Sequence, residues 1–283
     1  MKANLQKAIR RWLPPAIYDE LELIYSIARD TPQYLKSREA LNRNISLRNS
    51  ATQATVFLLA TGPSIRDLDL SLIAGRDCFT VSNFFLHEKI GELKPKYHFF
   101  APYHKPVVEE NFLDWLREAD RVLPSETKIV LGISDKEKVE KSKIFEGREI
   151  IFLMFGRGRV RTIDLRKPMM NPQTVPLVAL PFSMYCGYKN VVLCGCDHDT
   201  PRYFGGDIQH FYTKGEIRTG VSDSTIWESY GIEEELRSAL KVFEGYDVYA
   251  AVAKRLKITI LNASKTSWLR TFDFVDLVSA VSR

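Results

Sequence analysis

From residue 55 onward, short apolar segments alternate with longer amphipathic ones, and this alternation limits the fold more than any other feature. The short segments are too brief for buried helices, so they are expected to be strands. They are residues 56–60, 78–81, 97–100, 128–131, 149–153, 190–194 and 257–261. Helices are expected at residues 66–73, 108–117, 136–144, 175–186 and 228–255, the last with a break at Gly245. Strands separated by helices indicate an α/β fold with a doubly wound, mostly parallel, Rossmann-like sheet.

Length and composition set the domain organisation. The chain has 283 residues, 45% of them hydrophobic, which suits one large domain with a small appendage. We divide it into an N-terminal helical arm, residues 1–50, and a Rossmann-like domain, residues 51–283.

Charge and cysteine content narrow the partners and the compartment. The formal charge of +5 permits an acidic ligand or a membrane surface. Aromatic residues are not interleaved with Lys and Arg as in nucleic-acid platforms, so no nucleic-acid partner is predicted. The four cysteines form no Cys-x-x-Cys pair, and no signal peptide or apolar run of membrane-spanning length is visible. These features favour a cytoplasmic protein with reduced cysteines.

The N-terminal arm has a basic amphipathic character. Its first helix carries apolar residues on one face, namely Leu5, Ile9, Trp12 and Leu13, and is expected to end at Pro14-Pro15. Two further helices are expected at residues 17–28 and 34–41. Two interpretations stay open. Residues 1–30 touch an anionic inner membrane peripherally, or the arm packs on its own domain or on a second copy in a homo-oligomer.

The sharpest turn signal follows the first strand, at Thr61-Gly-Pro-Ser64. Gly62 permits a positive φ or the close approach of a ligand. Pro63 fixes φ, and Ser64 can cap the helix that follows. Because unpaired N–H groups and the helix dipole favour phosphate, we predict an anion-binding corner here. An ordinary βα turn without a ligand is the alternative.

Polar residues also follow the ends of other strands. Asn83 follows the second strand, and Tyr103 and His104 follow the third. Thr174 opens the long apolar helix at residues 175–186. Ligands bind beyond the carboxyl ends of parallel strands, so these residues are expected to converge with Ser64.

The strand at residues 190–194 ends in Gly195-Cys-Asp197-His198-Asp199. A carboxylate at the tip of a central strand suits the hydroxyl groups of a ribose, so Asp197 is predicted to bind a nucleotide. The spacing of Asp197 and Asp199 also fits a divalent metal, which takes hard oxygen ligands. We assign no metal ligand, and the metal interpretation is kept as the alternative.

A long loop follows, and loops of this length inside a compact domain are usually functional. We predict a lid at about residues 199–227. It carries Tyr203 and Tyr212, which can donate to a phosphate, and His210, which can exchange a proton near pH 7. The basic loop at residues 155–170 either holds an acidic acceptor or is simply solvated.

Several of these segments resemble one family. Ala60-Thr-Gly-Pro-Ser64 resembles the Gly-Asn-Gly-Pro-Ser start of the bacterial sialyltransferases of Campylobacter type, glycosyltransferase family 42. Val81-Ser-Asn83-Phe-Phe is similar to their Cys-Asn-Gln-Phe segment, and residues 187–197 to their Gly-Tyr-Lys…Ser-Gly-x-Asp segment. The resemblance covers residues 54–265 in separate islands. Asp197-His198 and His210-Phe-Tyr212 equally resemble the pterin-diphosphokinase-like proteins of bacterial polysaccharide clusters.

The resemblance implies an enzyme that uses a CMP-linked, sialic-acid-like or Kdo-like sugar to build a bacterial surface glycan, either lipopolysaccharide or capsule. The positions that it carries over as donor-binding are Gly62, Pro63, Ser64, Asn83, Thr174, Gly195 and Asp197, and the lid adds Tyr203 and Tyr212. The implied partners are a nucleotide-sugar donor and a glycan acceptor, with no cofactor required.

The sequence departs from the family pattern at catalytic positions. Ala101 stands where the family has an asparagine, and Asn171 or Pro172 stands where it has an arginine. The family's catalytic histidine lies just before the last long helix, where this chain has none. The base that takes the acceptor proton is therefore sought among His210, His198 and His104, in that order. Two other functions stay open: an Mg²⁺-dependent diphosphokinase of the 6-hydroxymethylpterin type, and a non-catalytic nucleotide-binding protein.

Overall fold

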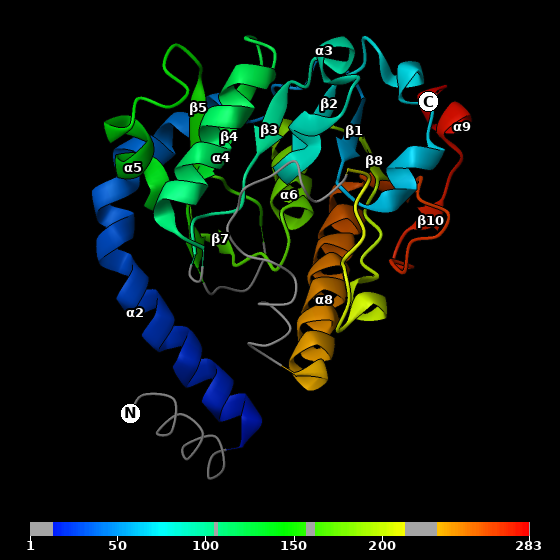
Figure 1. Ribbon diagram of the computed structural model, residues 1–283. Helices are drawn as coiled ribbons and strands as arrows, with labels where there is room; N and C mark the ends of the chain where they lie inside the picture. Colours follow the sequence, from blue (N-terminus) through cyan, green and yellow to red (C-terminus); the bar gives the residue numbers. More distant parts are fainter. Residues whose placement is uncertain (1–13, 105–106, 157–161, 213–230, 283) are drawn as a thin grey trace.

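The computed structural model describes residues 14–104, 107–156, 162–212 and 231–282. Its centre is an eight-stranded sheet in the order β10-β9-β8-β1-β2-β3-β4-β5 (Figure 1). The strands are β1 (Thr55–Leu59), β2 (Cys78–Val81), β3 (Tyr97–Phe99), β4 (Lys128–Gly132), β5 (Ile150–Leu153), β8 (Asn190–Cys194), β9 (Thr259–Asn262) and β10 (Asp273–Phe274). All neighbouring strands pair in parallel, so the predicted doubly wound parallel sheet is confirmed.

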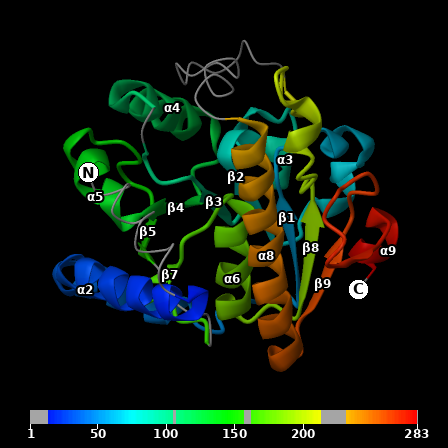
Figure 2. The ribbon, with the colours of Figure 1, turned by 90° about the horizontal axis from the view of Figure 1, so that it is seen from below.

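Helices cover both faces of the sheet (Figure 2). The α-helices are α2 (Pro15–Asn42), α3 (Ile90–Leu93), α4 (Glu109–Val122), α5 (Lys136–Lys141), α6 (Pro176–Cys186), α8 (Ile232–Leu256) and α9 (Leu277–Val281). The 3₁₀ helices are η1 (Arg43–Leu47), η2 (Pro63–Asp67), η3 (Leu70–Ile73), η4 (Ser82–Leu86), η5 (Ile133–Asp135) and η6 (Thr200–Tyr203). A small second sheet pairs β6 (Phe155–Gly156) with β7 (Met169–Met170).

The alternation of side chains along each strand divides the core in two. In β1, Phe57 and Leu59 join a cluster with α3, α4, α5 and α9. Val56 and Leu58 point the other way, into a cluster with α6 and α8. Because successive strand residues face opposite sides, a strand buried on both faces is apolar at every position, as β1 is from Val56 to Leu59.

Helix α6 is the most deeply placed helix, since all eleven of its residues are buried. It is apolar on every side, which is typical of a helix covered all round. Helix α8 covers it at Gly245, where an added Cβ would lie 2.7 Å from Leu177 Cδ1. The predicted break of this helix at Gly245 is therefore wrong. The helix is continuous, and the missing side chain allows two helices to approach closely.

The chain reverses its direction of winding between β1 and β8. Strands β1 to β5 follow one another outward to one edge of the sheet, and α6 then carries the chain back to β8 on the other side of β1. The register pairs Leu59 with Cys194, so the loops after both strands leave the sheet side by side. Such a switch point is where open α/β sheets bind ligands.

Two predicted helices differ from the structure. Residues 66–73 are the short 3₁₀ helices η2 and η3, because Leu68 is extended and Asp69 starts a new turn by accepting from Ser71 N at 3.1 Å. The segments predicted at residues 17–28 and 34–41 are one helix, α2, with Pro32 inside it. A proline inside a helix removes a single backbone hydrogen bond. The part of α2 that follows Pro32 is held on the domain by the burial of Leu41.

The end of the predicted arm is integrated with the domain. Leu41 and Leu47 are buried, and Asn44 Nδ2 donates to the carbonyl oxygens of Phe152 and Leu165 at 3.0 and 2.9 Å. The predicted first arm helix (residues 1–13), Arg157–Arg161 of the basic loop and residues 213–227 of the lid lie outside the described residues. In the part of the chain that is described, no helix has the length and apolarity to cross a membrane.

Candidate functional site

The turn after β1 fits tightly against the loop after β8. Gly62 N donates to Gly195 O at 2.9 Å, and a Cβ on Gly62 would lie 2.3 Å from Asp197 Oδ2. The φ of Gly62 is −65°, so of the two roles considered for this glycine the positive φ does not apply. Gly195 has the left-handed backbone, with φ +71°. Glycine is needed at position 62 because the protein's own carboxylate approaches it.

Ser64 and Asp197 form a buried pair at this turn. Ser64 N donates to Asp197 Oδ2 at 2.9 Å, and Ser64 Oγ donates to Asp197 Oδ1 at 2.5 Å. Gly195 N donates to Ser264 Oγ at 2.7 Å, and that hydroxyl lies 2.9 Å from Ser64 Oγ. Burial raises the pKa of Asp197, while its hydrogen bonds from Ser64 oppose this shift.

These contacts correct the expected anion-binding corner. The turn does bind an anion, but the anion is the Asp197 carboxylate, which is 4% exposed. The helix behind the turn has five residues, too few for a strong dipole. Asp197 therefore fixes the turn after β1 against the loop after β8. Its direct contact with a ribose stays a prediction.

Asn83 links the end of β2 to the first part of the predicted lid. Its Nδ2 donates to the Tyr212 hydroxyl at 2.7 Å, and its Oδ1 accepts from Trp115 Nε1 at 2.7 Å. The His210 ring stacks on the Tyr212 ring, with centroids 4.8 Å apart and planes at 4°. Because the Tyr212 oxygen accepts from Asn83, its own proton is left to donate to a ligand.

The same lid segment is anchored to the turn after β1. Phe211 N donates to Thr61 O at 3.2 Å. Arg66 donates through Nε to Phe211 O at 3.0 Å and through Nη2 to His210 O at 2.8 Å. Residues 210–212 therefore lie against the turn, and Asn83 lies beside both. Gly62, Ser64, Asn83, Asp197 and Tyr212 are therefore linked at the carboxyl edge of the sheet. Of the residues predicted to converge with Ser64 and Asn83, Tyr103 and His104 line a cavity that neither of those two residues lines.

His98 shows how Asn83 is held in place. It is fully buried in β3, with Nδ1 2.7 Å from Thr80 Oγ1 and Nε2 2.9 Å from Ser82 O. Burial lowers the pKa of His98 to about 3, so the ring is neutral at physiological pH. Ser82 has a φ of +52°, which turns the chain sharply just before Asn83. The imidazole therefore fixes the turn that presents Asn83.

His198 and Tyr203 lie on the α8 side of the β8 loop. His198 has a φ of +52°, and its Nε2 lies 2.8 Å from the Tyr246 hydroxyl. Burial lowers the pKa of His198 to about 4. The Tyr203 hydroxyl donates to Asp199 Oδ2 at 3.2 Å. No cluster of three or more His, Cys, Asp or Glu side chains within the described residues is arranged to hold a metal ion.

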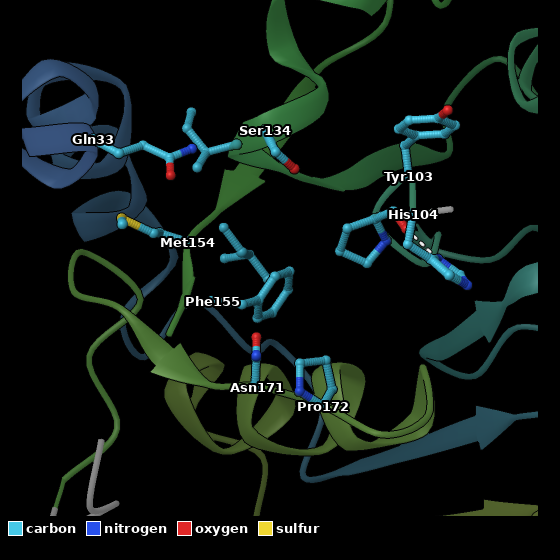
Figure 3. Close-up of a pocket in the computed structure, with 11 residues that line it drawn as sticks. Gln33, Tyr103, His104, Ser134, Met154, Phe155, Asn171 and Pro172 are labelled. Carbon is cyan, nitrogen blue, oxygen red and sulfur yellow. Dashed lines mark hydrogen bonds between the residues drawn. The ribbon is translucent and has the colours of Figure 1, made fainter. Parts of the chain in front are cut away.

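A cavity of about 310 Å³ opens at the same edge of the sheet, beyond β3, β4 and β5 (Figure 3). Its lining combines aromatic rings with amide, hydroxyl and imidazole groups: Gln33, Pro102, Tyr103, His104, Ile133, Ser134, Leu153, Met154, Phe155, Asn171 and Pro172. Helix α2 supplies Gln33, so the arm forms part of its wall. His104 is exposed, with Nδ1 3.0 Å from Pro102 O.

Aromatic side chains connect this cavity to Asn83. Tyr103 packs on Phe112 with ring centroids 5.5 Å apart, and Phe112 packs on Trp115 at 6.0 Å. Trp115 then donates to Asn83. The wall of the cavity and the Asn83–Tyr212 contact therefore belong to one packed row.

Asp135 supports the cavity from behind. It is 1% exposed, and its Oδ2 accepts from Tyr103 N at 3.0 Å. Burial raises the pKa of Asp135 to about 6, although the hydrogen bond from Tyr103 and the charge of Lys138 oppose this. The unfolded chain loses this proton near pH 4, where the folded chain keeps it. The contribution of Asp135 to stability is therefore present below pH 4 and is lost as the pH rises through 6.

We expect the Asp135→Asn variant to gain stability over the wild type as the pH rises. Asparagine keeps an oxygen for Tyr103 N without a charge that must be buried. The whole effect is about 3 kcal/mol, of which about 1.4 kcal/mol falls between pH 5 and 7.5. Urea unfolding of the wild type and the variant across this pH range measures the difference in their free energies of unfolding. The buried histidines contribute equally to both proteins, so their effect cancels in this difference. A difference that does not vary with pH would contradict the expectation.

Two further predicted residues lie nearby. Thr174 is half-buried just before α6, and within the described residues its side chain does not cap that helix. Asn171 and Pro172 line the cavity. Sequence reasoning missed Trp115, Ser264 and Asp135. Of these three, only Ser264 occupied a position that the sequence marked as a candidate, because it follows the last predicted strand.

The fold and the site define a doubly wound α/β protein with polar residues gathered at its switch point. No protein-family model matches the chain, and no curated protein matches it in sequence. Solved structures that it is similar to are sialyltransferases of Campylobacter jejuni, the family that the sequence motifs resemble.

Three of these structures illustrate the similarity. The sialyltransferase CstII in complex with CMP-3FNeuAc is 15% identical, with 79% of this chain and 86% of that chain covered and a TM-score of 0.44. An alpha-2,3-sialyltransferase in apo form is 15% identical, with 82% of this chain and 84% of that chain covered and a TM-score of 0.45. The monofunctional alpha-2,3-sialyltransferase Cst-I is 15% identical, with 81% and 82% covered and a TM-score of 0.43. The resemblance to pterin-diphosphokinase-like proteins stays a prediction.

Proposed function

We propose that this chain is a glycosyltransferase that moves a sugar from a CMP-linked donor to a hydroxyl group of a glycan. One observation carries the proposal: four segments far apart in sequence meet at the switch point between β1 and β8. They are residues 60–64, Asn83, residues 195–199 and residues 210–212. The motifs of the first three segments are those that resemble the sialyltransferases, whereas His210-Phe-Tyr212 resembles the pterin-diphosphokinase-like proteins. A switch point is where such sheets bind nucleotides.

The Asn83–Tyr212 pair supplies what a leaving phosphate needs. As the bond from the sugar to the phosphate breaks, the electron pair remains on the phosphate oxygen, and a donor placed there stabilises the charge. The Tyr212 hydroxyl can donate its proton here, because its oxygen takes the accepting role toward Asn83. Burial raises the pKa of Tyr212, so it donates as a neutral hydroxyl.

We place the glycan acceptor in the cavity beside Tyr103. Its volume of about 310 Å³ is at the lower end of small-ligand sites. Its aromatic faces can pack against a sugar ring, while Gln33, Ser134 and Asn171 offer amide and hydroxyl partners for sugar hydroxyls.

The transfer also requires a base. The acceptor oxygen forms a bond to the anomeric carbon, and its proton passes to a side chain. We propose His210 as this base, because its ring stacks on the ring of Tyr212, the residue proposed to donate to the leaving phosphate. His198 is the second candidate and His104 the third.

The finer assignments rest on the sequence resemblance. We propose a sialic-acid-like or Kdo-like donor sugar and a bacterial surface glycan, lipopolysaccharide or capsule, as the product. We further propose a cytoplasmic location, with catalysis that requires no metal. In this proposal the residues that touch the donor also include Gly62, Pro63, Ser64, Thr174, Gly195 and Tyr203.

Calorimetric titration of the full chain with CMP and with ATP tests the proposal. Binding of CMP that EDTA leaves unchanged, followed by turnover of a CMP-linked sugar, is the expected result. Binding of ATP that requires Mg²⁺ would point instead to the diphosphokinase, for which the Asp197–Asp199 spacing is the relevant feature. Binding of a nucleotide without turnover of any donor would point to a non-catalytic protein.

We expect the Asn83→Ala variant to bind CMP at least about fivefold more weakly than the wild type. The variant loses the amide that fixes the Tyr212 hydroxyl, and a hydrogen bond of this kind contributes about 1 kcal/mol or more. Asn190→Ala is the matched control, because Asn190 donates to Thr55 Oγ1 at the opposite edge of the sheet. Equal CMP affinity in both variants would remove Asn83 from the donor site.

A further inference from the structure

Helix α2 carries a regular row of side chains on its exposed side. The row, which we call the α2 seam, consists of Ile17, Leu21, Ile24, Ala28, Thr31 and Leu35. Its members are alternately four and three residues apart, and all are exposed. The four large apolar side chains among them are 51%, 52%, 62% and 60% exposed, in chain order. Spacing of this kind is the a/d repeat by which two helices pair in a coiled coil.

The seam faces away from the domain to which α2 belongs. The side chains that α2 turns toward the domain include Ser26 and Leu41, which are buried, and Tyr34, which packs against the core. Gln33 lines the cavity from that same side. Figure 1 shows the N-terminal half of α2 extending beyond the rest of the domain. Neither the core nor the proposed acceptor site uses the seam.

The charges along α2 indicate what covers the seam. Residues 17–25 contain three acidic residues and no basic one, whereas residues 28–38 contain three basic residues and one acidic residue. Two α2 helices placed antiparallel about residue 26 keep their acidic segments apart. Residues 17–25 of each then lie opposite residues 27–35 of the other, with Lys36 and Arg38 just beyond them. A parallel pair would oppose like charges, which costs free energy. An anionic membrane surface would likewise repel the acidic half.

We propose that the α2 seam pairs with the same seam of a second copy of this chain, antiparallel, in a dimer with two-fold symmetry. The antiparallel register is self-complementary about Ser26. It places Ile17 beside Leu35 of the other copy, Leu21 beside Thr31, and Ile24 beside Ala28. A two-fold interface of one patch with itself closes at two copies. The pairing would cover the exposed apolar side chains of the N-terminal half.

The mass of the full chain in solution tests the pairing. We expect the wild type to sediment at twice the 32.5 kDa of one chain. Ile24→Glu places a charge at the centre of the seam and is expected to raise the dissociation constant of the dimer at least tenfold. Leu240→Glu is the control, because Leu240 is 57% exposed on α8 and lies outside the seam. A wild type that stays monomeric at all concentrations would overturn the proposal, as would a dimer that Ile24→Glu leaves intact.

Cysteine cross-linking tests the direction of the pair. Residues 17 and 35 of one helix are about 27 Å apart along its axis. An antiparallel pair therefore cross-links only in a mixture of the Ile17→Cys and Leu35→Cys proteins, and neither variant cross-links alone. The four native cysteines are buried and do not compete. Cross-linking of Ile17→Cys to itself would show a parallel pair. A monomer that binds anionic vesicles through the seam would show a lipid partner; either result overturns the proposal.

Discussion

Replacing His210 by alanine is expected to lower the rate of sugar transfer by about 10²- to 10⁴-fold, the usual loss when a general base is removed. The attacking hydroxyl must lose its proton, and alanine has no group to accept it. Donor binding is expected to change little, because Tyr212 keeps its hydrogen bond with Asn83. Steady-state turnover of a CMP-linked sugar, with CMP affinity measured alongside, gives both values.

A second variant separates proton transfer from positioning. His210→Phe keeps an aromatic ring against Tyr212, whose ring centroid lies 4.8 Å from that of His210, but it cannot accept a proton. We expect it to be as slow as His210→Ala. Recovery of turnover in His210→Phe would show that the ring only positions Tyr212. Near-normal turnover in both variants would remove His210 from the mechanism, and the same measurement would then be made on His198→Ala and on His104→Ala.

Replacing Gly62 by alanine is expected to destabilise the fold by about 1–3 kcal/mol, the range for overpacking a filled site. The added Cβ would lie 2.3 Å from Asp197 Oδ2 and 2.5 Å from Gly195 O. Relieving these contacts must move the turn and disturb the hydrogen bonds between Ser64 and Asp197. Urea unfolding measures the loss as a lower midpoint with an unchanged slope.

Gly91→Ala is the matched control for Gly62→Ala. No atom lies within 4 Å of the Cβ that alanine would add at position 91. That variant is expected to be as stable as the wild type or slightly more stable, because alanine is the better helix former. If Gly62→Ala unfolds at the same urea midpoint as the wild type but binds CMP more weakly, the glycine serves the ligand and not the fold. A bulkier residue at position 62 tests both effects at once and cannot separate them.

Local patterns in the sequence determined the architecture. The run Val56–Ala60 is apolar throughout because both faces of β1 are buried, and the same holds for β8. Glycine and proline marked the end of β1, and helical segments between the strands required parallel connections. Because parallel strands end at one edge, the positions of Ser64 and Asn83 after two strands also predicted that they lie near each other.

Partners far apart in sequence were decided only by the tertiary structure. Asp197 lies 133 residues after Ser64, and nothing local shows that its carboxylate accepts from both Ser64 donors rather than from a ligand. The reason for glycine at position 62 is likewise the approach of that carboxylate. Asn83 donates to Tyr212, which lies 129 residues further along the chain. Gln33 lines the cavity because α2 continues past Pro32 and lies at the sheet edge. Backbone and apolar preferences act over a few residues and fix elements, whereas hydrogen bonds between buried polar groups depend on how the elements pack.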